Sequence, residues 1–192
     1  IWKNQKILAD KVATDTMREQ LNKLDIKGKV VIGEGELDEA PMLYIGEKLG
    51  SGNGPDIDIA VDPVEGTNFV AKNLPGAMSV IAVSEKGNLF NAPETYMQKI
   101  ATGNHIPKGT IDLDYSVEKN IENYSRETNK KPSEITVCIL DRSRHDRIIG
   151  ELKRLKVNIK YISDGDVAGV LLVTDKKFGV DIFMGIGGGP EG

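Results

Sequence analysis

The sequence predicts a mixed α/β protein, and three patterns support this prediction. Apolar residues recur near helical spacing over residues 3–24, a stretch without Gly or Pro, which predicts an amphipathic helix. Apolar and polar residues alternate over residues 57–62, which is typical of a half-buried strand. From residue 135 to residue 186, strand and helix patterns alternate as β-α-β-α-β, which indicates parallel strands with right-handed crossovers. Helices packed against sheets are therefore the expected architecture.

Glu34 lies between two glycines, with a predicted strand before it and a predicted helix after it. Residues 29–32 are predicted to form a short strand, and the glycines on either side of Glu34 allow a sharp turn that aims its carboxylate beyond the strand end. Residues 38–50 begin with a capping aspartate, carry a proline in the first turn and end in glycine, which predicts a helix. A plain surface turn is the alternative role for Glu34.

The alternating strand should end at Asp62. Pro63 has no amide hydrogen for a sheet ladder, so we expect the chain to leave the sheet there. A second, apolar strand is predicted at 77–84, and residues 86–88 have the composition of a hairpin turn.

A short helix starting at residues 91–94 is expected to carry Tyr96, a residue type that most often serves packing. Residues 103–115 are rich in turn formers and lack periodicity, so we place a domain junction there.

The last third carries polar residues after each predicted strand. The predicted elements are a helix at 117–128, strands at 135–140, 157–163 and 180–186, and helices at 146–155 and 166–174. In open α/β sheets, ligands bind outside the carboxyl ends of the strands. The polar groups at these ends are Asp141-Arg142-Ser143-Arg144-His145, then Asp164-Gly165-Asp166, and then a glycine run with Gly188 and Glu191. Three such ends in succession favour a site.

Acids and a hydroxyl follow the strand that ends at Asp62. Glu65 and Thr67 come one turn later, on either side of Gly66, and carboxylate and hydroxyl oxygens suit hard cations such as Mg²⁺ or Mn²⁺. The alternative is an Asx-type turn with solvated acids. Asp10 lies among the apolar positions of the first helix, and periodicity does not decide between a ligand and a solvated helix acid.

Arg142 and Arg144 supply guanidinium forks that suit phosphate oxygens. An acid cluster together with an arginine pair predicts a phosphate ester held between metal ions and basic side chains, because the metal ions reverse the local charge. Thr67 would orient the attacking water or act as the nucleophile, and we favour the first role because water next to a metal ion needs less activation.

Composition excludes several classes of function. The chain has 39% hydrophobic and 28% charged residues, which is ordinary for a soluble globular protein. A net charge of −4 argues against nucleic acid or acidic membranes as partners, and no apolar run approaches the ~20 residues of a membrane helix. Cys138, the only cysteine, is expected to be a buried thiol in a reducing cytoplasm. Two separated histidines make a zinc site improbable.

We expect the chain to be part of a longer protein. It begins with Ile1 rather than Met, and it ends in a glycine-rich loop of the kind that normally leads into another element. The predicted organisation is an N-terminal metal-binding α+β domain at 1–115 and a β-α-β-α-β domain at 116–192, incomplete at its C-terminus.

Asp62-Pro63-Val64-Glu65-Gly66-Thr67 resembles the Asp-Pro-x-Asp-Gly-Thr motif of the lithium-sensitive inositol monophosphatase superfamily. The form with Glu in place of the second Asp resembles bacterial class II fructose-1,6-bisphosphatase. The stretches 31–36, 38–46, 164–168 and 185–192 are similar to the same family, so the resemblance covers nearly the whole chain.

The resemblance implies hydrolysis of the 1-phosphate of fructose 1,6-bisphosphate, giving fructose 6-phosphate for gluconeogenesis. It implies a layered α-β-α-β-α sugar-phosphatase sandwich that forms a homo-oligomer, a dimer or a tetramer, and uses Mn²⁺ or Mg²⁺. By position, the implied metal ligands are Asp10, Glu34, Asp62, Glu65 and Glu191, and the implied catalytic residue is Thr67. The implied substrate contacts are Glu65, Gly66, Thr67, Tyr96, Arg142, Ser143, Arg144, Asp164, Gly165, Asp166 and Gly188.

One departure and two alternatives accompany the resemblance. The family carries Gly-Asp-Lys just before the first metal-binding acid, whereas Asn4-Gln5-Lys6 keeps only the lysine, which weakens the assignment of Asp10. The alternatives are a phosphatase for inositol phosphates, nucleotide bisphosphates or sedoheptulose bisphosphate, and a non-catalytic sensor of sugar phosphates or divalent cations. The hydroxyl of Thr67 favours an enzyme, because a pure binding site needs no group that orients water.

Overall fold

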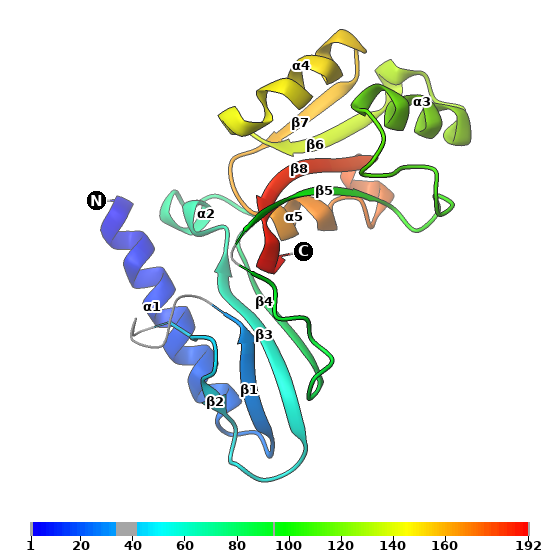
Figure 1. Cartoon of the computed structure of the whole chain (residues 1–192). Helices are drawn as coiled ribbons and strands as arrows, with labels where there is room; N and C mark the ends of the chain where they lie inside the picture. Colours follow the sequence, from blue (N-terminus) through cyan, green and yellow to red (C-terminus); the bar gives the residue numbers. More distant parts are fainter. Residues whose placement is uncertain (1, 34–41, 94, 192) are drawn as a thin grey trace. The chain divides into compact units, whose positions relative to one another are not determined.

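The chain divides into two compact units, Ile1–Glu94 and Thr95–Gly192, and each is described by itself. The structure, a computed structural model, describes residues 2–33, 42–93 and 95–191 (Figure 1). None of the helices in these ranges combines the length and the apolar character of a membrane span.

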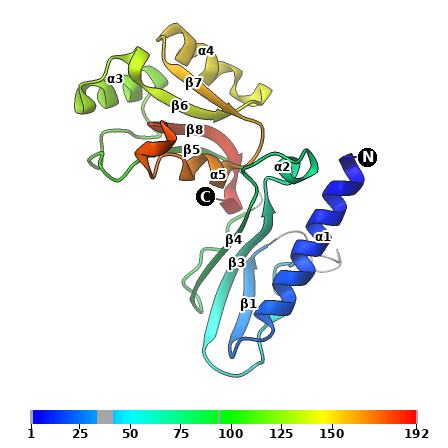
Figure 2. The same ribbon diagram turned by 180° about the vertical axis from the view of Figure 1, so that it is seen from behind.

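The first unit is a four-stranded sheet with one long helix along it. The strands are β1 (Lys27–Ile32), β2 (Lys48–Leu49), β3 (Asp56–Glu65) and β4 (Met78–Glu85), and they lie in the order β2-β1-β3-β4. β1 runs parallel to β3, and the outer pairs are antiparallel. The described residues of this unit form the helices α1 (Trp2–Leu21) and α2 (Thr67–Ala71), and α1 lies along one face of the sheet in both ribbon views (Figures 1 and 2).

The helix predicted at 3–24 is confirmed as α1, but only its second half packs as an amphipathic helix does. Leu21 is buried in the core cluster with Val30 and Ile59 of the sheet, and Met17 packs against the same cluster. Ile7, Leu8 and Val12, in the first half, are each more than half exposed. The apolar stripe that predicted the helix therefore extends beyond the core it covers.

Strand β3 does not end at Asp62, so that prediction was wrong. The strand continues to Glu65, and its pairing with β4 shifts register between Asp62 and Glu65. A bulge of this kind leaves one residue of the strand without a ladder partner, which is where a sheet tolerates proline. Pro63 therefore bends the strand instead of ending it, and Glu65 is brought to its carboxyl end.

The helix predicted at 38–50 is wrong in its described part, and residues 38–41 lie outside the described residues. Lys48–Leu49 forms β2, which pairs with β1, and a turn precedes it. The amide of Val30 donates to the carbonyl of Glu47 (2.9 Å), and Arg18 forms an ion pair with Glu47 (Nε–Oε1, 2.6 Å). Tertiary pairing with the neighbouring strand and helix thus outweighs the local helix signals.

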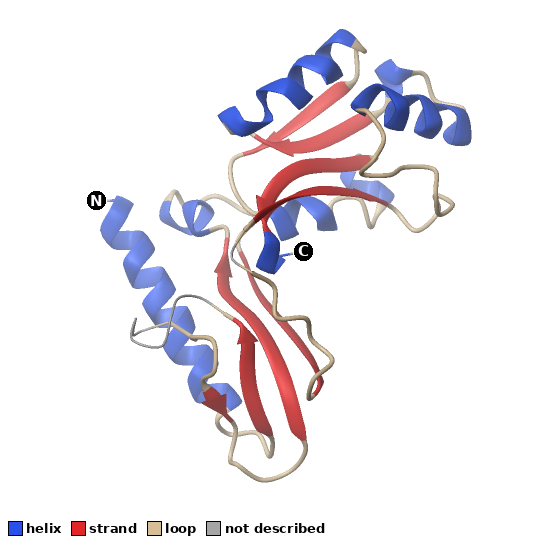
Figure 3. Ribbon diagram, in the orientation of Figure 1, coloured by secondary structure: helices blue, strands red, loops and turns tan. Residues whose placement is uncertain are grey.

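The second unit is a four-stranded sheet with helices on both faces (Figure 3). Its strands are β5 (Tyr96–Thr102), β6 (Thr136–Leu140), β7 (Asn158–Ile162) and β8 (Ile182–Gly188), in the order β5-β8-β6-β7. Its helices are α3 (Val117–Thr128), α4 (Asp146–Arg154) and α5 (Asp166–Leu171). Short 3₁₀ turns lie at Pro132–Glu134, Ser143–His145, Lys176–Phe178 and Gly189–Glu191.

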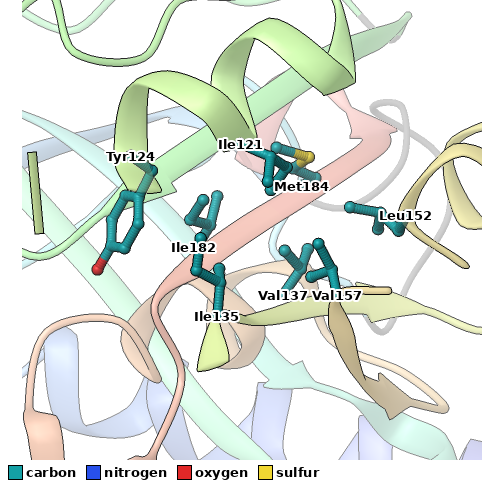
Figure 4. Close-up of a cluster of buried hydrophobic side chains, with 8 residues drawn as sticks. All are labelled: Ile121, Tyr124, Ile135, Val137, Leu152, Val157, Ile182 and Met184. Carbon is teal, nitrogen blue, oxygen red and sulfur yellow. The ribbon is translucent and has the colours of Figure 1, made fainter. Parts of the chain in front are cut away.

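The predicted β-α-β-α-β alternation is confirmed, because β6 pairs in parallel with both β7 and β8. Alternation along the strands sends side chains to two cores. Val137 and Ile182 pack with α3 and α4, as Figure 4 shows for the larger cluster, whereas Cys138 and Phe183 pack on the side of α5. Burial raises the pKa of the Cys138 thiol to about 11, which keeps it protonated, as expected for a core thiol.

The short helix predicted around Tyr96 is wrong. Residues Tyr96–Thr102 form β5, which pairs antiparallel with β8 over its whole length, from Tyr96 opposite Gly188 to Thr102 opposite Ile182. This pairing places β5 in the second compact unit. The predicted domain boundary, between residues 115 and 116, lies further along the chain than the division between the units and stays a prediction.

A partly buried carboxylate, Asp181, connects the start of β8 to the rest of the second unit. Asp181 accepts hydrogen bonds from the Tyr124 hydroxyl (3.0 Å), the Lys130 ammonium (2.6 Å) and the Thr136 amide (2.9 Å). Burial and the neighbouring Asp181 carboxylate raise the pKa of Tyr124, so its hydroxyl stays protonated and donates. The carboxylate thus joins α3, β6 and β8.

We predict that Asp181→Ala lowers the free energy of unfolding by about 2–4 kcal/mol, because it leaves the buried Tyr124 hydroxyl and the Thr136 amide without their acceptor. Lys130→Met is the matched control: its side chain is 41% exposed, and we expect a loss below about 1 kcal/mol. Urea denaturation followed by circular dichroism measures both. Equal losses in the two variants would contradict the role given to Asp181.

Candidate functional site

In the second unit, the carboxyl ends of three parallel strands meet at one edge of the sheet. β6, β7 and β8 are parallel, so the segments that follow them, from Arg142, from Asp164 and from Gly189, start at the same edge. β5 is antiparallel to β8, so it enters at this edge with Tyr96. The topology therefore gathers residues that are far apart in the sequence.

An ion pair joins the segment after β6 to the segment after β7. Arg142 Nη2 lies 3.2 Å from Asp164 Oδ1, and Arg142 Nη1 donates to the carbonyl of Asp141 (3.0 Å). Both side chains are partly exposed, so the pair is screened by solvent and contributes little to stability. Its main effect is to fix the direction of the Arg142 fork.

Arg144 is fixed against β8 and β5. Its Nε donates to the carbonyl of Ile186 at 2.7 Å, and its guanidinium lies over the ring of Tyr96, 5.0 Å from the ring centroid. Tyr96 is 67% exposed, so the ring contributes little to the core and presents most of its surface to solvent. A cation over an aromatic face is a weak attraction, and here it sets the position of a charged fork at the strand ends.

Asp166 is a buried acid with one satisfied oxygen. The residue is 5% exposed, Oδ2 lies 3.0 Å from Lys99 Nζ, and Oδ1 has no hydrogen-bond partner in the described part of the chain. Gly187 makes this placement possible, because a Cβ atom at that position would lie 1.5 Å from Asp166 Oδ2. An unpartnered buried carboxylate oxygen is costly unless a ligand supplies a donor or a cation.

Glu191 belongs to the same cluster, because its Oε2 lies 3.1 Å from Lys99 Nζ. The Lys99 side chain is only 8% exposed and contacts both carboxylates. This lysine was not among the site residues predicted from the sequence. Lys99 shares a face of β5 with Ala101, which packs in the core on the side of α5, and a lysine on a core face is a signal for function. This face is recognisable only if residues 96–102 form a strand, and we had predicted a helix around Tyr96.

Three further predicted residues lie on the same loops. Ser143 starts the 3₁₀ turn after β6 and is exposed. Gly165 precedes α5 with a positive φ of 82°, a conformation that favours glycine. Gly188 ends β8 opposite Tyr96, and a Cβ atom there would lie 3.3 Å from Glu191 Cδ. All three thus lie next to charged residues of the cluster, Ser143 and Gly165 in the chain and Gly188 in space.

In the first unit, the predicted residues lie at the bulged end of β3. Asp62 is half-buried and its Oδ1 accepts a hydrogen bond from the Val64 amide (3.0 Å), the Asx turn that we weighed as an alternative. Glu65 is 4% exposed and ends the strand. Gly66 has a φ of 81°, and a Cβ atom there would lie 2.7 Å from the Phe69 ring.

Thr67 is half-buried and starts the short helix α2, directly after the positive-φ glycine. Asp10 lies on α1, and burial raises the pKa of its carboxyl while the nearby Lys6 charge opposes that rise. Glu34 lies outside the described residues.

The structure links the predicted residues in two sets. In the second unit, hydrogen bonds, ion pairs and strand register connect Tyr96, Arg142, Arg144, Asp164, Asp166, Gly188 and Glu191. In the first unit, Asp62, Glu65, Gly66 and Thr67 follow one another on a single bulged strand end. Within residues 2–33, 42–93 and 95–191, no three His, Cys, Asp or Glu side chains gather as a metal-binding group.

The donor chemistry nevertheless fits a hard divalent cation. The predicted ligands are all carboxylates, which Mg²⁺ and Mn²⁺ prefer. Asp166 Oδ1, which is buried and has no hydrogen-bond partner in the described residues, is an oxygen acceptor that a cation or a donor from a ligand would satisfy.

Comparison with known proteins gives a match over the whole chain. Residues 1–192 match the family described as bacterial fructose-1,6-bisphosphatase, glpX-encoded. The chain is 48% identical to fructose-1,6-bisphosphatase 1 class 2 of Escherichia coli K12 over 192 residues. This alignment covers 100% of the chain and 57% of the E. coli protein.

A second relative is D-fructose 1,6-bisphosphatase class 2/sedoheptulose 1,7-bisphosphatase of Synechococcus sp. CC9902. It is 46% identical over 190 residues, which cover 99% of the chain and 57% of that protein. The protein with the same name from Prochlorococcus marinus MIT 9515 is 47% identical over 188 residues, 98% of the chain and 56% of that protein. The chain thus spans a little over half the length of these relatives. With the family matched from the first residue to the last, the chain belongs to the glpX-encoded bacterial fructose-1,6-bisphosphatases.

Proposed function

We propose that the protein to which this chain belongs hydrolyses the 1-phosphate of fructose 1,6-bisphosphate to fructose 6-phosphate and phosphate, a step of gluconeogenesis. Family membership and the names of the relatives support this substrate. The structural observation that carries the proposal is the gathering of Arg142, Arg144, Asp164 and Asp166 at one sheet edge. Guanidinium forks suit phosphate oxygens, and carboxylates suit the hydroxyls of a sugar.

The proposed cofactor is Mn²⁺ or Mg²⁺. The residues that would hold it are Asp10, Glu34, Asp62, Glu65 and Glu191. A divalent cation in such a site supplies Lewis-acid polarisation of the phosphoryl group and a more acidic water.

The chain's own residues would bind and orient the substrate. Arg142 and Arg144 would bind phosphate oxygens, with Ser143 donating beside them. Asp164 and Asp166 would accept hydrogen bonds from sugar hydroxyls, and Gly165 and Gly188 would let the substrate approach the backbone. Tyr96 would contact the sugar through its exposed ring, next to Arg144.

Thr67 would hold the attacking water in line with the phosphorus atom. The attacking water gives up a proton as its oxygen bonds to phosphorus. The P–O bond to the sugar breaks, and the sugar oxygen keeps the bonding electrons and takes up a proton, so the products are fructose 6-phosphate and inorganic phosphate. The alternative is Thr67 as the nucleophile, which would require a base that removes its own proton.

A second candidate substrate is sedoheptulose 1,7-bisphosphate, because relatives at 46% and 47% identity carry that activity in their names. Both sugars present a phosphate ester and hydroxyls to the same groups. Inositol phosphates, nucleotide bisphosphates and a sensor without turnover are further alternatives. We also propose that the complete protein is cytoplasmic and forms a homo-oligomer, a dimer or a tetramer.

The decisive assay is phosphate release by the complete protein from fructose 1,6-bisphosphate. We expect turnover with Mn²⁺ or Mg²⁺, loss of turnover after EDTA, and recovery when the metal is added back. Sedoheptulose 1,7-bisphosphate, an inositol phosphate and a nucleotide bisphosphate serve as the comparison panel. Binding of fructose 1,6-bisphosphate without any release of phosphate, with both metals tried, would support the sensor instead.

We predict that Thr67→Ala lowers kcat by roughly 10²–10⁴-fold while KM changes little, because a group that orients water acts in the transition state. Thr67→Ser is the matched control, since it keeps the hydroxyl, and it should retain most of the activity. A KM that rises as much as kcat falls would show that Thr67 binds the substrate in its ground state.

We predict that Arg142→Ala raises KM for fructose 1,6-bisphosphate by about 10–100-fold, with a smaller effect on kcat, because it removes a charge-assisted contact to phosphate. Arg147→Ala is the control, because Arg147 lies on α4, its side chain is 92% exposed and it contacts Glu151. Equal KM values in the wild type and in the Arg142 variant would rule out the phosphate contact.

A further inference from the structure

His145 spans two strands where their direct pairing ends. β6 and β8 are registered at Val137 with Ile182 and at Cys138 with Phe183. Beyond these pairs, the fully buried ring of His145 lies between the strands: Nδ1 is 2.7 Å from the carbonyl oxygen of Leu140, and Nε2 is 2.9 Å from the amide nitrogen of Ile186. The hydrogen bonds of the ring therefore replace the backbone hydrogen bonds that would otherwise continue the pairing of β6 with β8.

The two partners define the tautomer of this ring. The carbonyl of Leu140 can only accept, so Nδ1 carries the hydrogen and donates it. The amide of Ile186 can only donate, so Nε2 is unprotonated and accepts. Nε2 also lies 3.1 Å from the carbonyl oxygen of Ile186, a contact that holds no hydrogen in this tautomer. That oxygen receives its hydrogen bond from a different residue.

That residue is Arg144, the neighbour of His145 in the chain. Its Nε donates to the carbonyl oxygen of Ile186 at 2.7 Å. Two adjacent side chains thus bind the two backbone groups of one residue: the amide of Ile186 is held by the histidine and its carbonyl by the arginine. The distance between β6 and β8 at this point and the direction of the guanidinium are fixed together.

We propose that His145 is a positioning residue for Arg144. By holding the end of β8 against the end of β6, the ring keeps the Ile186 carbonyl where Arg144 Nε can reach it, and it keeps the guanidinium over Tyr96. The inference rests on the proposed function, in which Arg144 binds a phosphate of the substrate. A purely structural histidine would stabilise the fold without acting through Arg144, so the two roles differ in a measurable coupling.

The test is a double-mutant cycle in the complete protein with H145F, R144A and the double variant. Phe fills the volume of the ring without its hydrogen bonds. We expect H145F to raise KM for fructose 1,6-bisphosphate by roughly 5–30-fold with kcat within about threefold of the wild type, which is the size of effect that one or two lost hydrogen bonds have. In the R144A background, the same substitution should change KM by less than about twofold.

H145Q supplies the conservative rescue. The amide group of Gln donates to Leu140 and its oxygen accepts from Ile186, so KM should return to within about threefold of the wild type. If H145F does not fold, H145N takes its place in the cycle, because Asn is polar but too short to span both strands. Thermal melting of every variant separates loss of folding from loss of substrate affinity.

Three results would overturn the inference: KM effects of H145F that are equal in the wild-type and R144A backgrounds, a KM unchanged by H145F, or a KM unchanged by R144A. The first two leave the proposed function intact when the wild type releases phosphate. If the wild type releases none, the proposed function fails by itself, and the same cycle is read from the Kd of fructose 1,6-bisphosphate in isothermal titration calorimetry.

Discussion

The parallel pairing of β6 with β7 and with β8 is the constraint on which the candidate site depends. Parallel strands place their carboxyl ends at one edge, and the loops that leave this edge carry the arginines, Asp164, Asp166 and Glu191. The two cores on the faces of this sheet, around Tyr124 on one side and Phe183 on the other, maintain the pairing. The topology thus brings the charged groups of the site together.

Charge at this edge is arranged in pairs that cross between elements. Lys99 of β5 contacts one acid at the start of α5 and another after β8, and Arg142 contacts the acid that follows β7. Pairs that are exposed, such as Arg142 with Asp164, contribute direction more than stability. The buried pair of Lys99 with Asp166 is different, because removing Lys99 would leave the Asp166 carboxylate inside the protein without its cation, whereas Lys99 itself also contacts Glu191.

The sequence predicted the second unit better than the first, for physical reasons that particular residues show. Buried parallel strands are apolar runs bounded by turns, so β6 and β8 were recognisable without tertiary information. The helix predicted at 38–50 failed because β2 is a two-residue strand that exists only by pairing with β1. The extension of β3 through Pro63 and the strand nature of Tyr96–Thr102 likewise depend on partners far away in the chain.

The same distinction applies to the site. Asp62, Arg142 and Asp164 lie directly after strand patterns and were found for that reason. Lys99 and His145 belong to no recognisable sequence motif. Their roles become visible only in the fold, where β5 pairs with β8 and the direct pairing of β6 with β8 ends before His145. Gly187 has no room for a side chain beside Asp166. A side chain at that position would displace the Asp166 carboxylate from Lys99, so new substrate preferences in this scaffold would evolve through exposed residues of the same sheet edge, such as Tyr96 and Ser143.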